Sequence, residues 1–120
     1  MTAKKRILIC DDEEGIRESL KLILENDYDL IFSCNGKECL EKLECEQDVK
    51  LVLLDIKMPK QNGLEITQEI KRACPDIKII IVTGYASPEI AQEAICIGVN
   101  DYIPKPFASK EILRKVNNLC

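Results

Sequence analysis

Short runs of apolar residues alternate with longer amphipathic segments five times along the chain. Each run holds four to six apolar or β-branched residues, and the third and fourth runs are apolar at nearly every position. Strands that are buried on both faces of a parallel sheet have this continuous apolar character. The pattern predicts five strands, at Arg6–Cys10, Asp29–Cys34, Val49–Asp55, Lys78–Thr83 and Asp101–Pro104.

The segments between these strands show helical spacing and the residues typical of helix ends. One apolar face is formed in the first helix by Ile16, Leu20, Ile23 and Leu24, and in the fifth, after Ser109, by Ile112, Leu113, Val116 and Leu119. The first helix is expected to begin with four acids, Asp11 to Glu14, which complement the helix dipole. The second helix is expected after Asn35-Gly36. The third is expected between Asn62-Gly63 and Cys74-Pro75, and the fourth between Ser87-Pro88-Glu89 and Gly98.

Alternation of strands and helices in units of this size indicates right-handed βαβ crossovers and a parallel sheet. The expected fold is therefore α/β, a flavodoxin-like (βα)5 three-layer sandwich with strand order 2-1-3-4-5. With 120 residues, the chain is expected to form one domain over residues 1–120. Because it stops with the fifth helix, we expect no second domain in these residues, and we expect the chain to be either a stand-alone protein or the N-terminal piece of a longer one.

Polar residues suited to phosphoryl chemistry stand at the ends of four of the predicted strands. They are an acid pair, an acid, a hydroxyl and an amine: Asp11 with Asp12, Asp55, Thr83 and Lys105. Taken singly, each has an ordinary explanation, such as acids at a helix start or a solvated lysine. In open α/β sheets, however, sites form at the carboxyl ends of the strands where the strand order reverses. The predicted order places the first and third strands side by side, so we expect these residues to form one site.

Three neighbouring carboxylates repel one another and are tolerated mostly when a cation neutralises them. Oxygen ligands of this kind suit Mg²⁺, for which Mn²⁺ is a substitute. A carboxylate can also accept a phosphoryl group, and the transition state then needs cations and donors on several sides. In this scheme Asp12, with Asp11, holds the metal, Asp55 attacks, and Lys105 and Thr83 bind phosphoryl oxygens.

Composition excludes several other classes of protein. The formal net charge of −4 and pI of about 5.0 disfavour direct nucleic-acid binding. No apolar run approaches the ~20 residues of a membrane span, and Lys4-Lys5-Arg6 does not begin a secretory signal, so a soluble cytoplasmic protein is expected. The seven cysteines show no C-x-x-C motif and are interpreted as reduced packing residues. The absence of histidine excludes phosphohistidine carriage and His-based acid–base chemistry.

Four segments together resemble the receiver domain of two-component response regulators, the CheY-like family. The resemblance covers essentially the whole chain, and the Asp-x-x-Met-Pro-x-x-x-Gly and Lys-Pro-Phe motifs occur at family spacing. The matching segments are Ile7-Leu8-Ile9-Cys10-Asp11-Asp12, Leu53-Leu54-Asp55-Ile56-Lys57-Met58-Pro59 through Gly63, Ile81-Val82-Thr83-Gly84, and Asp101-Tyr102-Ile103-Pro104-Lys105-Pro106-Phe107.

The resemblance implies a phosphoprotein of a phosphorelay, in which Asp55 receives the phosphoryl group from a sensor histidine kinase or a phosphotransfer protein. It implies that Asp11, Asp12, Asp55 and the backbone carbonyl of Lys57 bind Mg²⁺. Such a protein is not an enzyme in the usual sense, because it catalyses only its own phosphorylation and dephosphorylation.

The resemblance also implies a switch formed by Thr83 and Tyr102. In the family, the threonine moves toward the phosphoryl group and the aromatic ring turns inward, which reshapes the face formed by the fourth helix, fifth strand and fifth helix. The Lys105-Pro106 peptide bond is cis in the family. Two positions that vary freely there, Lys57 and Tyr85, are hypothesised to slow self-dephosphorylation.

Three alternatives remain at this stage. A haloacid-dehalogenase-type phosphatase uses similar residues but carries its nucleophile on the first strand, and an FMN-binding flavodoxin needs a hydroxyl- and glycine-rich loop where this chain has acids. A receiver that binds proteins without phosphorylation would be expected to lack a site residue.

The sequence does not specify which partner responds to phosphorylation. A downstream effector, a fused output domain or a phosphorylation-dependent homodimer would each fit the mixed-charge surface of the fourth and fifth helices. That surface is predicted to comprise Glu89, Gln92, Glu93, Lys110, Arg114 and Lys115.

Overall fold

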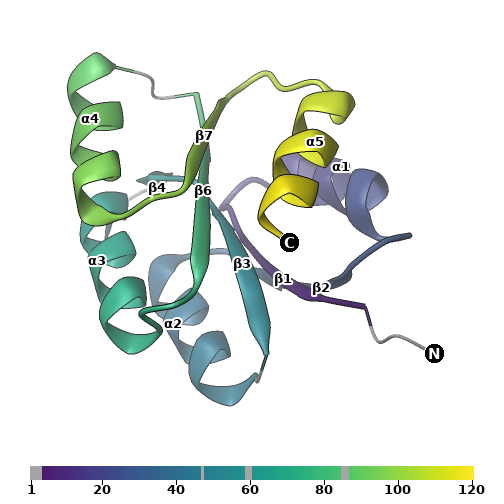
Figure 1. The fold of residues 1–120 in the computed structure, drawn as a ribbon, viewed down its shortest axis with the longest axis horizontal. Helices are drawn as coiled ribbons and strands as arrows, with labels where there is room; N and C mark the ends of the chain where they lie inside the picture. The colour runs from purple at the N-terminus through teal and green to yellow at the C-terminus, as the bar shows by residue number, and fades with distance from the viewer. Residues whose placement is uncertain (1–3, 47, 59–60, 85–86) are drawn as a thin grey trace.

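A five-stranded parallel sheet forms the centre of the molecule (Figure 1). The computed structural model describes residues 4–46, 48–58, 61–84 and 87–120. The strands are β1 (Arg6–Cys10), β2 (Asp29–Ser33), β3 (Val49–Leu54), β6 (Lys78–Thr83) and β7 (Asp101–Pro104). Their order, β2-β1-β3-β6-β7, is the predicted 2-1-3-4-5, and every neighbouring pair is parallel. The predicted flavodoxin-like α/β fold is thereby confirmed.

Helices cover both faces of this sheet, giving three layers. Figure 1 shows α1 and α5 on one side and α2, α3 and α4 on the other. Their bounds are Glu14–Leu24 for α1, Gly36–Cys45 for α2, Gly63–Ala73 for α3, Pro88–Ile97 for α4 and Ser109–Leu119 for α5. None of the helices in the described part of the chain has the length and apolar character needed to cross a membrane.

The strands are apolar throughout because each contributes to two separate cores. In β3, Leu51 and Leu53 pack with α1 and α5, whereas Val52 and Leu54 pack on the opposite face. All four are at most 1% exposed. Burial of one such side chain contributes about 1.5–3 kcal/mol, so the central strands hold the two helical layers to a common scaffold.

Local capping accounts for where α2 begins and for both ends of α4. The side chain of Asn35 accepts a hydrogen bond from the Glu38 amide, and that of Ser87 from the Ile90 amide. Gly98 ends α4 with a φ of 112°, a left-handed conformation that disfavours residues with a Cβ. These signals stand in the sequence at the predicted positions.

The start of α1 differs from the prediction. The helix begins at Glu14, so Asp11 and Asp12 lie in the preceding loop and Glu13 at the N-cap. The acid run therefore does not form the first turn of the helix. Similarly, β2 and β3 each end one residue earlier than predicted.

A two-stranded hairpin after Asp55 was not predicted. It pairs β4 (Lys57–Met58) with β5 (Gln61–Asn62) in antiparallel fashion. Strands of two residues carry no detectable periodicity. The hairpin returns the chain so closely that a Cβ on Gly63 would lie 2.2 Å from the Ile56 Cα, so a glycine is required there.

Candidate functional site

Three backbone hydrogen bonds bring the predicted site residues to one level at the carboxyl edge of the sheet. The Asp11 amide donates to the Ser33 carbonyl at 3.1 Å, the Asp55 amide to the Cys10 carbonyl at 3.0 Å, and the Lys105 amide to the Thr83 carbonyl at 3.0 Å. Each bond continues the pairing pattern one residue beyond a strand. Residues up to 94 positions apart in sequence therefore start from a common edge.

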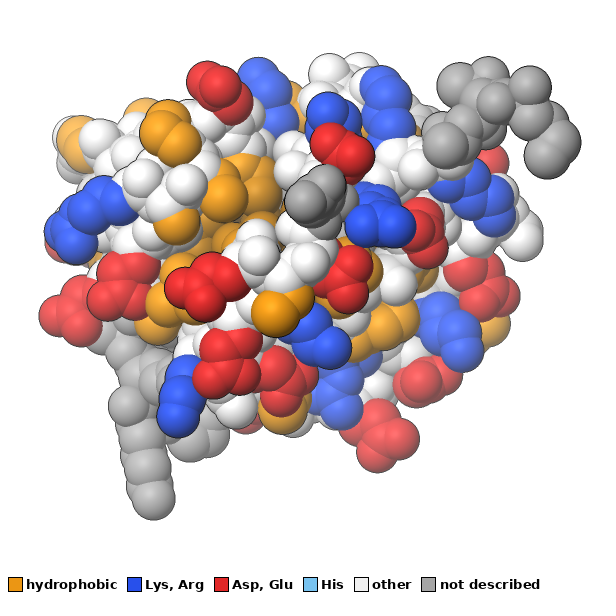
Figure 2. Space-filling model, turned by 90° about the horizontal axis from the view of Figure 1, so that it is seen from below, with side chains coloured by type: hydrophobic (Ala, Val, Ile, Leu, Met, Phe, Trp, Pro, Cys, Tyr) orange, Lys and Arg blue, Asp and Glu red, His pale blue; other side chains and the backbone are white. Residues whose placement is uncertain are grey.

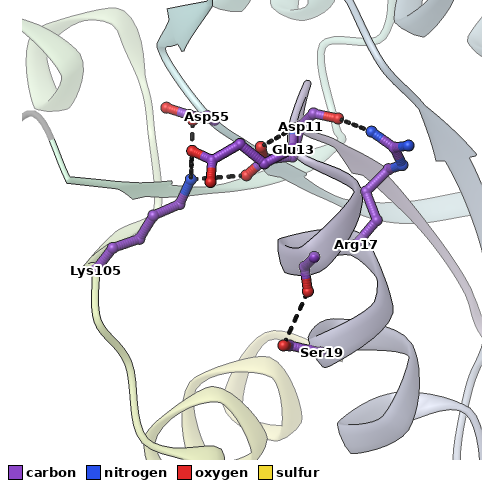
Figure 3. A network of polar contacts seen from close by, with 7 residues as sticks. Asp11, Glu13, Arg17, Ser19, Asp55 and Lys105 are labelled. Carbon is purple, nitrogen blue, oxygen red and sulfur yellow. Dashed lines mark hydrogen bonds and ion pairs between the residues drawn. The ribbon is translucent and has the colours of Figure 1, made fainter.

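Lys105 joins the two buried acids of this edge (Figure 3). Its Nζ lies 2.9 Å from Asp11 Oδ2 and 3.0 Å from Asp55 Oδ2. The side chains of Asp11 and Asp55 are 3% and 4% exposed, and that of Lys105 is 12% exposed. Such charge-assisted bonds are screened less than surface ion pairs, and they offset the cost of burying these charges.

Burial and charge shift the proton affinities of this cluster. Burial raises the pKa of Asp11, and the negative charge of Asp55 adds to that rise, while the bonds from the Glu13 amide and Lys105 oppose it. Burial would lower the pKa of Lys105, but its hydrogen bonds to Asp11 and Asp55 outweigh this, so its pKa is raised. Lys105 is therefore a stable ammonium at neutral pH.

Two further carboxylates complete the cluster. Ligand oxygens of Asp11, Asp12, Glu13 and Asp55 all lie within 4.8 Å of one another, and Asp12 and Glu13 are on the exposed side. Glu13 Oε1 also lies 3.8 Å from Lys105 Nζ. Four carboxylates against one lysine leave excess negative charge, and all the donors are hard oxygens, so the group fits a cation such as Mg²⁺.

Glu13 was not among the predicted site residues. From the sequence, the acids after Asp12 were expected only to complement the dipole of the first helix. In the structure Glu13 is the N-cap of α1, but its side chain makes no capping bond. Its position directly after the acid pair was the only signal for a place in the site.

Thr83 and Tyr102 lie on the same face of the sheet. In the β6–β7 register Ile81 pairs with Tyr102 and Thr83 with Pro104, so strand alternation places both side chains on the side of α3 and α4. Thr83 is fully buried, whereas Tyr102 is half-buried, and burial raises its pKa. The Lys105–Pro106 peptide bond that leads out of β7 is cis.

Some predicted residues are not at the described site. Tyr85 and the side chain of Lys57 lie outside the described residues, although the Lys57 backbone belongs to β4. Their rate-tuning role stays a prediction. Lys115, predicted on the partner surface, contacts Asp101 and the Tyr102 carbonyl and is partly exposed, so its place in a partner surface stays a prediction.

Similarity to known proteins identifies the family. A family model described as the response regulator receiver domain matches residues 7–117. The chain belongs to this family. It is thus a receiver domain of two-component signalling systems.

Two curated response regulators are similar in sequence to this receiver domain. Response regulator SaeR of Staphylococcus aureus is 34% identical over 114 residues, and response regulator MprA of Mycolicibacterium vanbaalenii is 33% identical over 115. These matches cover 94% and 95% of the chain but 49% of each relative, so the receiver spans about half the length of these relatives.

A solved structure, the CheY-like response regulator receiver domain protein from Methanospirillum hungatei JF-1, is 38% identical with a TM-score of 0.91. The match covers 97% of this chain and 93% of that one. The similarity therefore extends over the whole fold, including the carboxyl edge of the sheet.

Proposed function

We propose that Asp55 accepts a phosphoryl group from a histidine kinase or phosphotransfer protein in a Mg²⁺-dependent reaction. The observation that supports this most directly is the buried contact of Lys105 with both Asp11 and Asp55, inside a cluster with excess carboxylates. A purely structural ion pair needs one acid. A site that receives a metal ion and a phosphoryl group needs several acids and a mobile ammonium.

In the proposed reaction an Asp55 carboxylate oxygen forms a bond to phosphorus as the bond from phosphorus to the donor nitrogen breaks. The donor keeps that electron pair on its imidazole, and Asp55 becomes an acyl phosphate. Lys105 then faces a phosphoryl oxygen in place of the carboxylate that it contacts now. Thr83, at the end of the adjacent strand, supplies a hydroxyl on the same side.

Asp12, Asp11, Asp55 and the Lys57 carbonyl would hold Mg²⁺, which neutralises charge on the transferred group. Both Asp11 carboxylate oxygens already accept hydrogen bonds, from the Glu13 amide and from Lys105. Among the described residues, the Asp12 side chain makes no hydrogen bond or ion pair. Asp12 is thus the carboxylate most available to a cation.

The conformational effect of phosphorylation is proposed to reach the face formed by α4, β7 and α5 through Thr83 and Tyr102. This proposal is supported by their common side of the sheet and by the partial exposure of Tyr102 on β7. Phosphorylation would shift an equilibrium between two arrangements of that face. An effector, an output domain or a second copy of the chain would then bind one arrangement better.

The test is incubation with acetyl phosphate and Mg²⁺, followed by intact-mass measurement of wild type, Asp55→Asn and Asp27→Asn. Asp27, an exposed acid in the turn after α1, is the matched control. We expect one phosphoryl adduct on wild type and Asp27→Asn, none on Asp55→Asn, and none when EDTA replaces Mg²⁺. Mn²⁺ should restore the adduct. Continuous phosphate release from many substrates would instead indicate a phosphatase, and no adduct on wild type would indicate a receiver that is not phosphorylated.

A further inference from the structure

Asp11 is hydrogen-bonded at all four of its polar atoms. Its amide donates to the Ser33 carbonyl, its Oδ1 accepts from the Glu13 amide, and its Oδ2 accepts from Lys105. The fourth bond comes from α1, where Arg17 Nη1 donates to the Asp11 carbonyl at 2.7 Å. This last contact has no part in the phosphoryl chemistry described above.

Arg17 holds the loop before α1 at two points. Its backbone amide donates to the Glu13 carbonyl at 3.1 Å, and its side chain reaches back to Asp11. Asp12, whose side chain has no partner among the described residues, lies between these two anchored residues. Figure 3 shows Lys105 and Arg17 approaching Asp11 from opposite sides. The loop is therefore fixed on both sides of the carboxylate most available to a cation.

The charge of Arg17 opposes such a role, since a guanidinium near the acid cluster repels a cation. A carbonyl could also be satisfied by water, so the contact is not needed to avoid an unpaired group. Arg17 is half-buried, and holding it in this contact costs the rotamer freedom of a long side chain. An arginine at this position is explained if two conditions hold: Arg17 orders the loop, and this ordering strengthens cation binding by more than the positive charge of Arg17 weakens it.

We propose that Arg17 is a positioning residue of the cation site: by holding the Asp11 carbonyl, it fixes the backbone that presents the Asp12 carboxylate to Mg²⁺. The inference rests on the proposed function, in which this cluster binds Mg²⁺. Arg17 contacts neither the metal nor the phosphoryl group. It acts through the backbone of the loop.

The test compares wild type with Arg17→Met, Arg17→Lys and the control Arg72→Met, which changes an exposed arginine on α3. The Mg²⁺ dissociation constant is measured by titration calorimetry, and unfolding free energy by urea denaturation in EDTA. We expect the dissociation constant to rise about tenfold in Arg17→Met and by less in Arg17→Lys, with no change in Arg72→Met; tenfold corresponds to about 1.4 kcal/mol. At saturating Mg²⁺, phosphorylation by acetyl phosphate should return to near the wild-type rate.

The sign of the effect separates this role from its alternatives. If Arg17 acts only through charge, Arg17→Met binds Mg²⁺ more tightly and Arg17→Lys is unchanged, which overturns the proposal. If it serves only stability, both variants unfold at lower urea with an unaltered dissociation constant, and the proposal fails again. Should Arg17→Met not fold, Arg17→Lys, which keeps the charge without the fork of donors, decides alone.

Failure of the proposed function gives a different result. If wild type binds no Mg²⁺, or binds it no more tightly than Asp12→Asn does, the proposed cation site is refuted and the role of Arg17 is refuted with it. Wild type that binds Mg²⁺ through Asp12, with Arg17 variants that bind equally well, leaves the proposed function standing and refutes only the positioning role.

Discussion

Two lysines join β7 and its flanks to neighbouring elements, and their surroundings differ in charge. Lys105 contacts the carboxylates of Asp11 and Asp55, with Glu13 at a longer distance. Lys115, on α5, donates to Asp101 Oδ1 at 3.0 Å and to the Tyr102 carbonyl at 2.9 Å. Asp11 and Asp55 are almost fully buried, whereas Asp101 is 37% exposed.

The contrast shows how a functional cluster differs from a structural one. Around Lys115 one base meets one acid, and Asp101 also accepts a hydrogen bond from the Tyr102 amide, so each charge is matched. Around Lys105 one base meets two buried acids, Asp11 and Asp55, and the exposed Glu13 lies 3.8 Å away. The buried part of this cluster therefore holds one carboxylate more than it has bases, an excess that favours binding of a cation.

The largest expected difference between the two lysines is in phosphorylation. Lys105→Met should slow the transfer from acetyl phosphate by about 100-fold or more, because a donor aimed at developing charge is typically worth that much. Lys115→Met should stay within about threefold of wild type, since removal of a structural contact affects the chemistry only indirectly. Initial rates from intact mass at saturating Mg²⁺ measure both. Equal losses of phosphorylation rate in the two variants would contradict a specific role of Lys105 in the transfer.

Mg²⁺ should stabilise the chain through the Lys105 cluster only. At ten times its dissociation constant, a ligand that binds the folded state adds about 1.4 kcal/mol to the unfolding free energy. This gain should be absent in Asp12→Asn and complete in Asp101→Asn. Urea denaturation followed by circular dichroism, with Mg²⁺ or EDTA, checks it; an equal gain in all three proteins would place the ion elsewhere.

Alkaline pH should remove the contribution of Lys105 to the unfolding free energy. Its pKa is raised in the folded state, so the folded chain holds this proton more tightly than the unfolded chain does. The resulting stability is fully present below the ordinary lysine pKa of about 10.5 and is lost as pH rises through the folded value. The difference in unfolding free energy between wild type and Lys105→Met should therefore shrink above that pH. A difference that grows there would contradict the assignment.

The smallest effect is expected at the matched pair. Asp101→Asn keeps an oxygen for the Tyr102 amide but loses the ion pair with Lys115, which is partly exposed. Its unfolding free energy should fall by no more than about 1 kcal/mol, or roughly 4 °C in Tm for a chain of this size. Thermal denaturation measures this, and a loss of several kcal/mol would show that the pair is a major support of β7.

The sheet and the main site residues could be predicted because both depend on local signals. Continuous apolar strands specify a parallel sheet, and its topology brings Asp11, Asp55 and Lys105 to one edge. Contacts that depend on side-chain direction could not be predicted. Neither the turn of Glu13 toward Lys105 nor the reach of Arg17 to the Asp11 carbonyl has a sequence pattern, and the β4–β5 hairpin is too short to show one.

The proposed phosphoacceptor directly follows the strand that lies in the middle of the sheet. β3 is paired with β1 on one side and β6 on the other, whereas β7 pairs only with β6. Amide hydrogens of a doubly paired strand exchange with solvent mainly through global unfolding, while those of an edge strand exchange through local opening. Phosphorylation of Asp55 should therefore change the slow exchange of β3 only as far as it changes the global stability, and should alter the faster exchange of β7 in addition, even though the new bond is formed next to β3.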